Sequence, residues 1–256
     1  MKTLAKVFFV CVACLSANLF IGCSEDPVDD TPKRVIPKSG SSYTYVRSER
    51  ANADPFATVS GTDTVHTVTS QADIRTFAGK DSVVTFVDVN TMNTSATPDT
   101  MTIAYEANGD ISIYRGNGFE GLPPGTGIEI PTWWKLPFKS KTDIVIINEA
   151  VGISIDVFTV DSVKGIAKGY STTVNYTLNG KTYACEQADV TFTAYGRITS
   201  PFTIPLTLVF KTTYLFNEEI GYFVSFDTQN NIPQLAWSLI DPDNNIQVLT
   251  SFDVKK

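Results

Sequence analysis

Histidine and cysteine are scarce in this sequence, which narrows the chemistry open to it. The 256 residues include one histidine, His66, and four cysteines. Any catalytic group built on a histidine base therefore depends on His66, for which the alternating sequence around it predicts an ordinary solvated strand position. Cys185 is the only cysteine after residue 23, and we expect it to be a small buried side chain. One thiol forms neither an internal disulfide nor a thiolate metal site.

Positive charge is also scarce. The chain carries 20 Lys and Arg residues against 27 Asp and Glu residues, for a net charge of −7 at pH 7. No basic run or basic amphipathic helix offsets this balance. A negative surface repels nucleic acid, so nucleic acid is excluded as a partner.

Motifs for catalysis, phosphate binding and metal binding are missing as well. No Gly-x-Ser-x-Gly turn occurs, and the Gly-x-Gly-x-x-Gly string at residues 116–121 leads into prolines instead of a helix. Residues 241–245 carry oxygen ligands at alternate positions, as calcium loops do. The sixth position is Ile246 instead of glycine and the twelfth is Phe252 instead of glutamate, so we expect a plain turn. The sequence therefore predicts no metal, no cofactor and no enzyme activity.

The first residues are typical of an exported lipoprotein. Two lysines precede the apolar run 7–15, and the segment closes on Leu-Phe-Ile-Gly-Cys at residues 19–23. A positive start, a short apolar run and a small residue before the cleavage point are features of a signal peptide, and the run is too short for a membrane span. We predict that residues 1–22 are removed and that Cys23 becomes the lipidated first residue.

Residues 23–40 are acidic, contain spaced prolines and have few apolar side chains. Such a segment is expected to be a tether, because it cannot bury enough apolar surface to fold. Ser24, instead of Asp, follows the cysteine, which by sorting rules of related systems argues against retention in the inner membrane. Two or three acyl chains anchor a protein stably. We therefore expect an outer-membrane lipoprotein, facing the periplasm or the cell surface, held by its N-terminal lipid.

Residues 41–256 are predicted to form a single β domain. Apolar and polar residues alternate there with a period of two, and Thr, Val, Ile and aromatic residues dominate, as in half-buried strands. The predicted strands span residues 42–49, 62–69, 82–89, 100–106, 111–115, 144–147, 153–163, 170–178, 181–195, 202–216, 221–227 and 246–254.

Turn residues indicate how these strands connect. Asn108-Gly109 and Asn179-Gly180 are hairpin signals, because type I′ turns need positive φ at both central residues. Residues 217–221 are predicted to form a longer hairpin loop. Sequential hairpins predict an all-β, antiparallel meander that curls into a curved sheet, a half-barrel or a barrel.

One short helix is predicted over residues 70–79. Ser70 is a suitable N-cap, and Ile74, Phe77 and Ala78 fall on one helical face. Gly79 stands where a helix end requires a left-handed residue.

Several short motifs resemble those of uncharacterised envelope lipoproteins. They are an aromatic opening strand at residues 40–47, Leu-Pro-Phe at 136–138, Gly-Lys-Thr-Tyr at 180–183 and an aromatic closing hairpin at 214–222. Those proteins are similar in pattern to the curved antiparallel sheets of lipoprotein-carrier half-barrels. The resemblance implies such a fold, and it carries over no catalytic residue.

The adjacent residues Trp133 and Trp134 are the candidate ligand-binding residues. They follow the Gly- and Pro-rich segment 116–131, which is either a functional loop or a domain boundary. In extended backbone their side chains point to opposite faces, so one fills the core and the other meets solvent, the loop or a ligand.

Two functions follow from these features. In the first, the curved sheet binds an apolar or lipid-like ligand, because Phe202, Leu206, Leu208 and Phe210 share one face with Tyr222, Val224 and Phe226 in a predicted apolar wall. In the second, an exposed indole binds a glycan or a partner protein within an uptake complex. A continuous apolar concave face selects the first function, whereas a flat exposed indole beside polar side chains selects the second.

Overall fold

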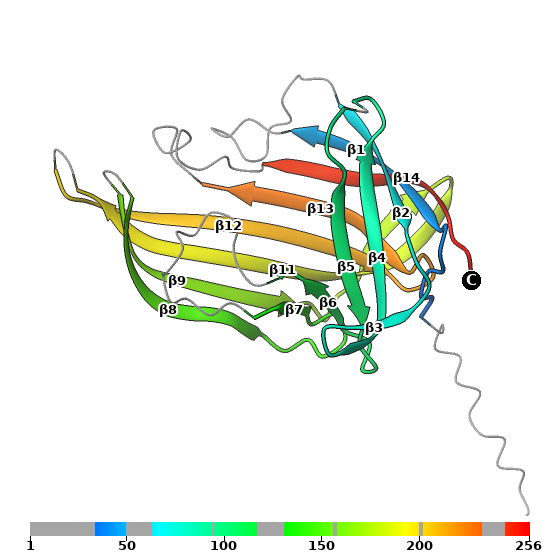
Figure 1. Cartoon of the computed structure of the whole chain (residues 1–256), viewed down its shortest axis with the longest axis horizontal. Helices are drawn as coiled ribbons and strands as arrows, with labels where there is room; N and C mark the ends of the chain where they lie inside the picture. Colours follow the sequence, from blue (N-terminus) through cyan, green and yellow to red (C-terminus); the bar gives the residue numbers. More distant parts are fainter. Residues whose placement is uncertain are drawn as a thin grey trace, which may run out of the picture. The chain divides into compact units, whose positions relative to one another are not determined.

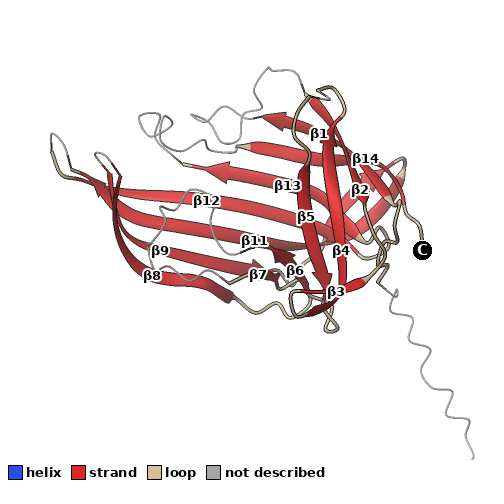
Figure 2. Cartoon of the chain, viewed as in Figure 1, coloured by secondary structure: helices blue, strands red, loops and turns tan. Residues whose placement is uncertain are grey.

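The computed structural model describes residues 34–49, 63–93, 95–116, 131–155, 158–199, 202–231 and 244–256. These residues form strands and turns without any helix (Figure 2). In the same residues there is accordingly no helix that is long and apolar enough to cross a membrane. The sequence-based prediction of an all-β chain is confirmed.

The strands are β1 (Ser42–Glu49), β2 (Thr64–Ser70), β3 (Arg75–Phe77), β4 (Lys80–Asn90), β5 (Asp99–Tyr105), β6 (Ile111–Tyr114), β7 (Trp133–Leu136), β8 (Ile144–Ile155), β9 (Phe158–Gly169), β10 (Val174–Leu178), β11 (Lys181–Ile198), β12 (Ile204–Asn217), β13 (Tyr222–Asn230) and β14 (Asn245–Asp253).

Neighbouring strands pair antiparallel in the order β7-β6-β5-β4-β2-β1-β14-β13-β12-β11-β9-β8. The short strands β3 and β10 pair with β4 and β11 outside this path. Since β1 pairs with β14, the two ends of the described chain meet in the middle of the strand order. The meander predicted from the hairpins is thus confirmed, and its two edges are β7 and β8.

The sheet curls into a nearly closed, barrel-like structure. In Figure 1, β4 and β5 run at a steep angle to the long strands β11, β12 and β13. The edge strand β7 lies against β9 and β11, where the Trp134 ring packs 4.7 Å from the Phe192 ring, centroid to centroid. Side-chain packing, and not a continuous backbone ladder, therefore brings the two ends of the sheet together.

The core is rich in aromatic side chains whose polar atoms are satisfied by backbone. Tyr43, Tyr45 and Tyr105 are buried and donate hydrogen bonds to the carbonyl oxygens of Ile220, Phe223 and Gly221, at 3.2, 2.5 and 2.7 Å. Burial raises the pKa of all three hydroxyls, so they remain neutral donors. These bonds fix the β12–β13 turn, predicted as the closing hairpin, onto the opposite wall of the sheet.

The predicted helix over residues 70–79 is wrong. Ser70 ends β2, where its hydroxyl donates to the Lys38 carbonyl oxygen at 2.6 Å instead of capping a helix. Ala78 and Gly79 both adopt positive φ, at 46° and 75°, and form the two-residue turn between β3 and β4. Ile74, which a helix would bury, is 47% exposed. Pairing with β4 prevails over a local helical pattern too short to be stable alone.

Packing of the β domain begins at Arg34 instead of at residue 41. The backbone N–H of Val35 donates to the Glu218 carbonyl oxygen at 2.9 Å, and Ile36 packs against the core. Residues 34–40, assigned to the tether from the sequence, thus belong to the same compact unit as the strands. The signal peptide, Cys23 and the rest of the tether lie outside the described residues.

Four strands extend beyond the packed core and form what we call the arm: residues 150–155 of β8, 158–163 of β9, 194–198 of β11 and 204–208 of β12 (Figure 1). The opposite end of the domain, which we call the base, holds residues 34–40 and the β5–β6, β7–β8 and β12–β13 loops. The arm and the base are thus at opposite ends of the long strands.

Candidate functional site

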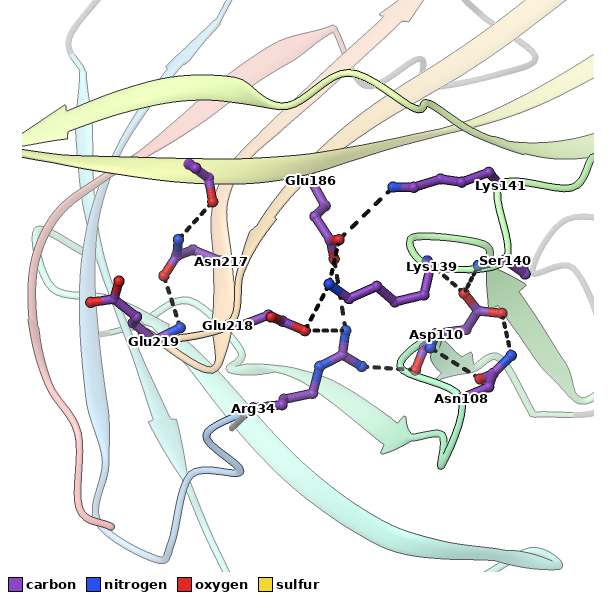
Figure 3. Close-up of polar contacts among 11 residues, drawn as sticks. Arg34, Asn108, Asp110, Lys139, Ser140, Lys141, Glu186, Asn217, Glu218 and Glu219 are labelled. Atoms are coloured by element: carbon purple, nitrogen blue, oxygen red, sulfur yellow. Dashed lines mark hydrogen bonds and ion pairs between the residues drawn. The ribbon is translucent and has the colours of Figure 1, made fainter. Parts of the chain in front are cut away.

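A buried ionic cluster holds the base together (Figure 3). The Arg34 guanidinium lies 3.8 Å from Glu186 and 3.5 Å from Glu218, and it stacks on Phe216 at 4.9 Å from the ring centroid. Lys139 contacts both carboxylates, at 2.8 and 3.2 Å. Lys141 lies 3.9 Å from Glu186, so the two carboxylates are matched by three cations at short range, as burial of charge requires.

Asp110 fixes the β5–β6 loop onto the β7–β8 loop in the same region. Its Oδ1 accepts hydrogen bonds from the backbone N–H groups of Lys139 and Ser140, at 2.8 and 3.0 Å, and its Oδ2 lies 3.0 Å from the Lys135 ammonium. Burial alone would raise the pKa of this carboxyl, but the Ser140, Lys135 and Lys139 donors together lower it to about 2. These contacts hold the loops of the base to one another, so we assign this end of the domain a structural role.

The inner face of the arm is a different environment, where β9, β11 and β12 present apolar side chains and Glu149 of the edge strand β8 pairs beside Val163. Cross-strand pairing places residues of β9, β11 and β12 on one face, which continues the core face of the same strands. We call this surface the apolar strip. It consists of Val160 and Val163 of β9, Ala194, Gly196 and Ile198 of β11, and Ile204, Leu206, Leu208 and Phe210 of β12.

Exposure along the strip increases toward the tip of the arm. Leu208 is buried, Phe210, Leu206 and Val163 are half-buried, and Ile204 is 51% exposed. Phe202, directly before β12, is 75% exposed. The strip therefore begins in the core and ends as an open apolar surface.

The outer face of the same strands is mixed, with the 47% exposed Tyr195 and the half-buried Val209 among polar side chains. It carries Lys164, Thr193, Arg197, Thr207 and Lys211, which alternate along the strands with members of the apolar strip. Strands with one apolar and one polar face normally bury the apolar face. A contiguous exposed apolar surface, such as the strip toward the tip of the arm, is a common sign of a site that receives a ligand or a partner.

The two tryptophans point to opposite faces of β7. Trp134 is buried against Phe192 at the inner end of the apolar strip, with the Arg115 guanidinium 4.8 Å from its ring centroid. Trp133 is half-buried on the other face, against Tyr114 and Phe77 at centroid distances of 5.1 and 6.3 Å. Its Nε1 donates to the Ala78 carbonyl oxygen at 3.0 Å. Trp134 is thus next to the strip, and Trp133 packs against the β3–β4 hairpin.

The predicted apolar wall is only partly continuous. Tyr222, Val224 and Phe226 are buried, and Phe226 pairs with Tyr214 near the base. The β12–β13 pairing ends at Phe210 and Asn230, so Leu206 and Leu208 extend beyond it. The β13 residues belong to the closed core, and only the β12 residues reach the strip.

The remaining candidate residues are placed as follows. Cys185 is fully buried, and burial raises the pKa of its thiol to about 12, so it is no nucleophile. His66, expected in solvent, is instead 8% exposed and contacts Asp88.

Within the described residues no group of three or more His, Cys, Asp or Glu side chains is arranged to hold a metal ion. Residues 241–243 of the expected turn lie outside the described residues, as does most of the segment 116–131.

A shallow groove of about 470 Å³ separates the two sheet edges. It is lined by Pro131 and Thr132, before β7, and by residues 145–149 of β8. Its lining mixes apolar side chains with Asn148 and Glu149, so it lacks the uniform chemistry of the apolar strip.

Sequence reasoning missed most of the strip. It identified Leu206, Leu208 and Phe210 by their alternation, but it assigned Val160, Val163 and Ile198 to no common surface. Each of these strands alternates in the same way along its whole length, so the pattern does not show where the core ends. The signal that marks the arm is strand length, because β11 and β12, with 18 and 14 residues, are longer than β13 and β14, with 9 residues each.

Comparison with known proteins identifies no family. No family model matches the sequence, and no curated protein matches it. A predicted lipoprotein of Parabacteroides distasonis is similar in structure, with a TM-score of 0.44 and 11% identity over 87% of this chain and 100% of the other. A predicted exported protein of Bacteroides fragilis with a YmcC-like fold has a TM-score of 0.41 and 9% identity over 87% and 100%. Both TM-scores are too low to support a conclusion about this chain.

Proposed function

We propose that the protein is an envelope lipoprotein that binds the acyl chain of a lipid-like ligand on the apolar strip. The observation that carries this proposal is the uninterrupted apolar character of the strip and its opening to solvent at the arm. The signal sequence and Cys23 support the location, and a lipid anchor would keep the domain in an envelope where such ligands are abundant.

The dimensions of the strip favour a single extended chain. From Phe210 to Ile204 it runs six residues along β12, or about 20 Å at the usual rise per residue. Across three strands it is about 10 Å wide. An extended fatty acyl chain has about this length and needs no polar partner along its methylenes. Burying the half-exposed strip residues supplies about 25 cal/mol for each Å² of apolar surface removed from water.

The position of the strip also fits a carrier or a binding protein. The chain enters the β domain at the base, through Arg34, and the strip opens at the opposite end. A tether joined to the base would leave the arm free to reach a ligand away from the anchoring membrane. Trp133, the candidate for stacking on a glycan, packs on Phe77 and Tyr114, so no specific contact favours the carbohydrate-binding alternative.

Attachment is tested by metabolic labelling with a fatty acid. We expect the full chain to be labelled in its host and Cys23→Ser to lose the label. An unlabelled wild-type protein, or a labelled variant, would contradict the assignment of Cys23 as the lipidated residue.

Ligand binding is tested with a fluorescent fatty acid and the full chain in lipid nanodiscs, with empty nanodiscs as the blank. The double variant Val160→Thr, Val163→Thr keeps side-chain shape but places two hydroxyls on the strip, and we expect about tenfold weaker binding, equivalent to about 1.4 kcal/mol. The matched control is Val209→Thr, since Val209 is half-buried on the outer face of β12. Equal affinities of the double variant and the wild type would refute the proposed binding surface.

A further inference from the structure

Three polar side chains on the inner faces of β2 and β4 form a connected chain of hydrogen bonds. The Thr64 hydroxyl lies 3.0 Å from Nε2 of His66, and Nδ1 of His66 lies 2.9 Å from Oδ1 of Asp88. The His66 and Asp88 side chains are 10% and 25% exposed. The group therefore lies in a largely desolvated position that solvent still reaches.

One tautomer of the imidazole satisfies all three groups. In that tautomer Nδ1 carries a proton, and the Asp88 carboxylate accepts the hydrogen bond from it. Nε2 is then the free acceptor, and the Thr64 hydroxyl donates to it. A hydroxyl that donates to an imidazole held by a carboxylate is the arrangement of a nucleophile, a general base and its orienting group, which is recognised by geometry and not by sequence order.

The surroundings of the group hold its members in place. The Gln247 side chain donates to the second oxygen of Asp88 at 3.3 Å. Thr64 pairs across the strands with Arg47, which shares its face and in turn pairs with Gln247.

We propose that Thr64, His66 and Asp88 form an acyl-transfer site that hydrolyses carboxylic esters. Oγ1 of Thr64 forms a bond to the ester carbonyl carbon, while its proton passes to Nε2 of His66. The carbon–oxygen bond to the leaving alcohol then breaks, and the alcohol takes that proton. Water, deprotonated by His66, attacks the acyl-Thr64 ester, releases the carboxylic acid and restores the hydroxyl. Only the ester and water are consumed.

The surroundings of Thr64 indicate the substrate class. Thr64, Arg47, Gln247, Phe226 and Tyr214 follow one another across β2, β1, β14, β13 and β12, so the polar group and the strip lie on the same inner face of the sheet. Phe226 and Tyr214 are buried in the core between them. We therefore expect the substrate to be a short-chain carboxylic ester that binds at Thr64 without reaching the strip.

The test measures the release of p-nitrophenol from p-nitrophenyl butyrate by the full chain. We expect saturable hydrolysis that falls by roughly 100-fold or more in Thr64→Val and in His66→Asn. Thr64→Ser retains the hydroxyl and should retain activity. Asp88→Asn should lower kcat with little change in KM, because it disturbs the orientation of the imidazole and not the binding of the ester. Thr67→Val is the matched control, since Thr67 lies on the same strand but on its other face.

A fluorophosphonate reagent gives a second readout, because its phosphorus bonds to the attacking oxygen as fluoride leaves. Mass spectrometry should locate this adduct on Thr64 in the wild type and on no residue of His66→Asn, with each variant first shown to unfold at the wild-type temperature. Hydrolysis no faster than in buffer, or an equal rate in Thr64→Val, would overturn the proposal. The variant Val160→Thr, Val163→Thr should hydrolyse p-nitrophenyl butyrate at the wild-type rate, so a failure of the strip is distinguished from a failure of the site.

Discussion

At the residue scale, Gly221 is the position that depends most clearly on having no side chain. Its φ is +71°, and a Cβ there would lie 2.5 Å from the Val35 carbonyl oxygen. The residue thus combines a left-handed turn with close contact to the segment that enters the base. Both requirements exclude a larger residue.

We expect Gly221→Ala to lower the free energy of unfolding by about 2 kcal/mol or more. Gly180→Ala is the matched control, because Gly180 has a φ of +78° but no atom within 4 Å of an added Cβ. That control should lose only about 1 kcal/mol, the conformational cost alone. Denaturant unfolding of both variants measures the difference, and equal losses would show that the contact with Val35 is unimportant.

Asp110 gives a pH-dependent prediction at the same scale. Its folded pKa of about 2 lies below the usual value of 3.8, so its stabilising effect is full above pH 4 and is lost as the pH falls through 2. Asp110→Asn should therefore cost roughly 2 kcal/mol at pH 7, and the difference from wild type should shrink between about pH 4 and pH 2. Asp253→Asn, with its exposed side chain, should cost under about 0.5 kcal/mol. A difference for Asp110→Asn that stays constant with pH would contradict the role of its charge.

Single residues differed in how well the sequence predicted them. Cys185 was expected to be buried, which is confirmed, because small apolar side chains on strands usually are. His66 was expected in solvent, which is wrong, because alternation assigns a residue to a face without showing which face becomes the interior. Its partner Asp88 is 22 residues away on β4 and becomes its neighbour only through the β2–β4 pairing.

At the element scale, turn residues predicted hairpins well. Asn179 and Gly180 adopt positive φ, at 50° and 78°, as a type I′ turn requires. At Asn108-Gly109 the hairpin is present, but only the glycine has positive φ, and the Gly109 N–H donates to the Glu106 carbonyl oxygen at 2.9 Å within a longer loop. The failed helix at residues 70–79 has the same physical origin, since strand pairing selects the local backbone conformation.

Substitutions of Trp134 and Trp133, which lie on opposite faces of β7, should affect ligand binding differently. Trp134 packs on Phe192 beside the strip, whereas Trp133 packs on Tyr114 away from it. We expect Trp134→Leu to weaken binding of the fluorescent fatty acid and Trp133→Leu to leave it unchanged. Leucine keeps most of the apolar bulk, so both variants should remain folded, which circular dichroism checks. A larger loss of binding in Trp133→Leu than in Trp134→Leu would place the ligand on the Trp133 face of β7, which contradicts binding on the strip.

At the scale of the whole molecule, the sequence predicted the strands and their antiparallel sense but not the final form of the sheet. Closure depends on the pairing of β1 with β14 and on Trp134 meeting Phe192, contacts between residues far apart in the chain. The arm exists because β11 and β12 are longer than β13 and β14, which continue the sheet beside them. The alternation of apolar and polar residues along single strands shows neither how the sheet closes nor where the arm begins.

The most direct test of the account uses a photoactivatable fatty acid added to cells that produce the full chain. After illumination, mass spectrometry locates the residues to which the fatty acid has bonded. The apolar strip predicts adducts on the inner-face residues Val163, Ala194 and Leu206, and none on the outer-face residues Thr193 and Thr207. Adducts spread equally over both faces, or absent from β9, β11 and β12, would contradict the proposal that the strip binds an acyl chain.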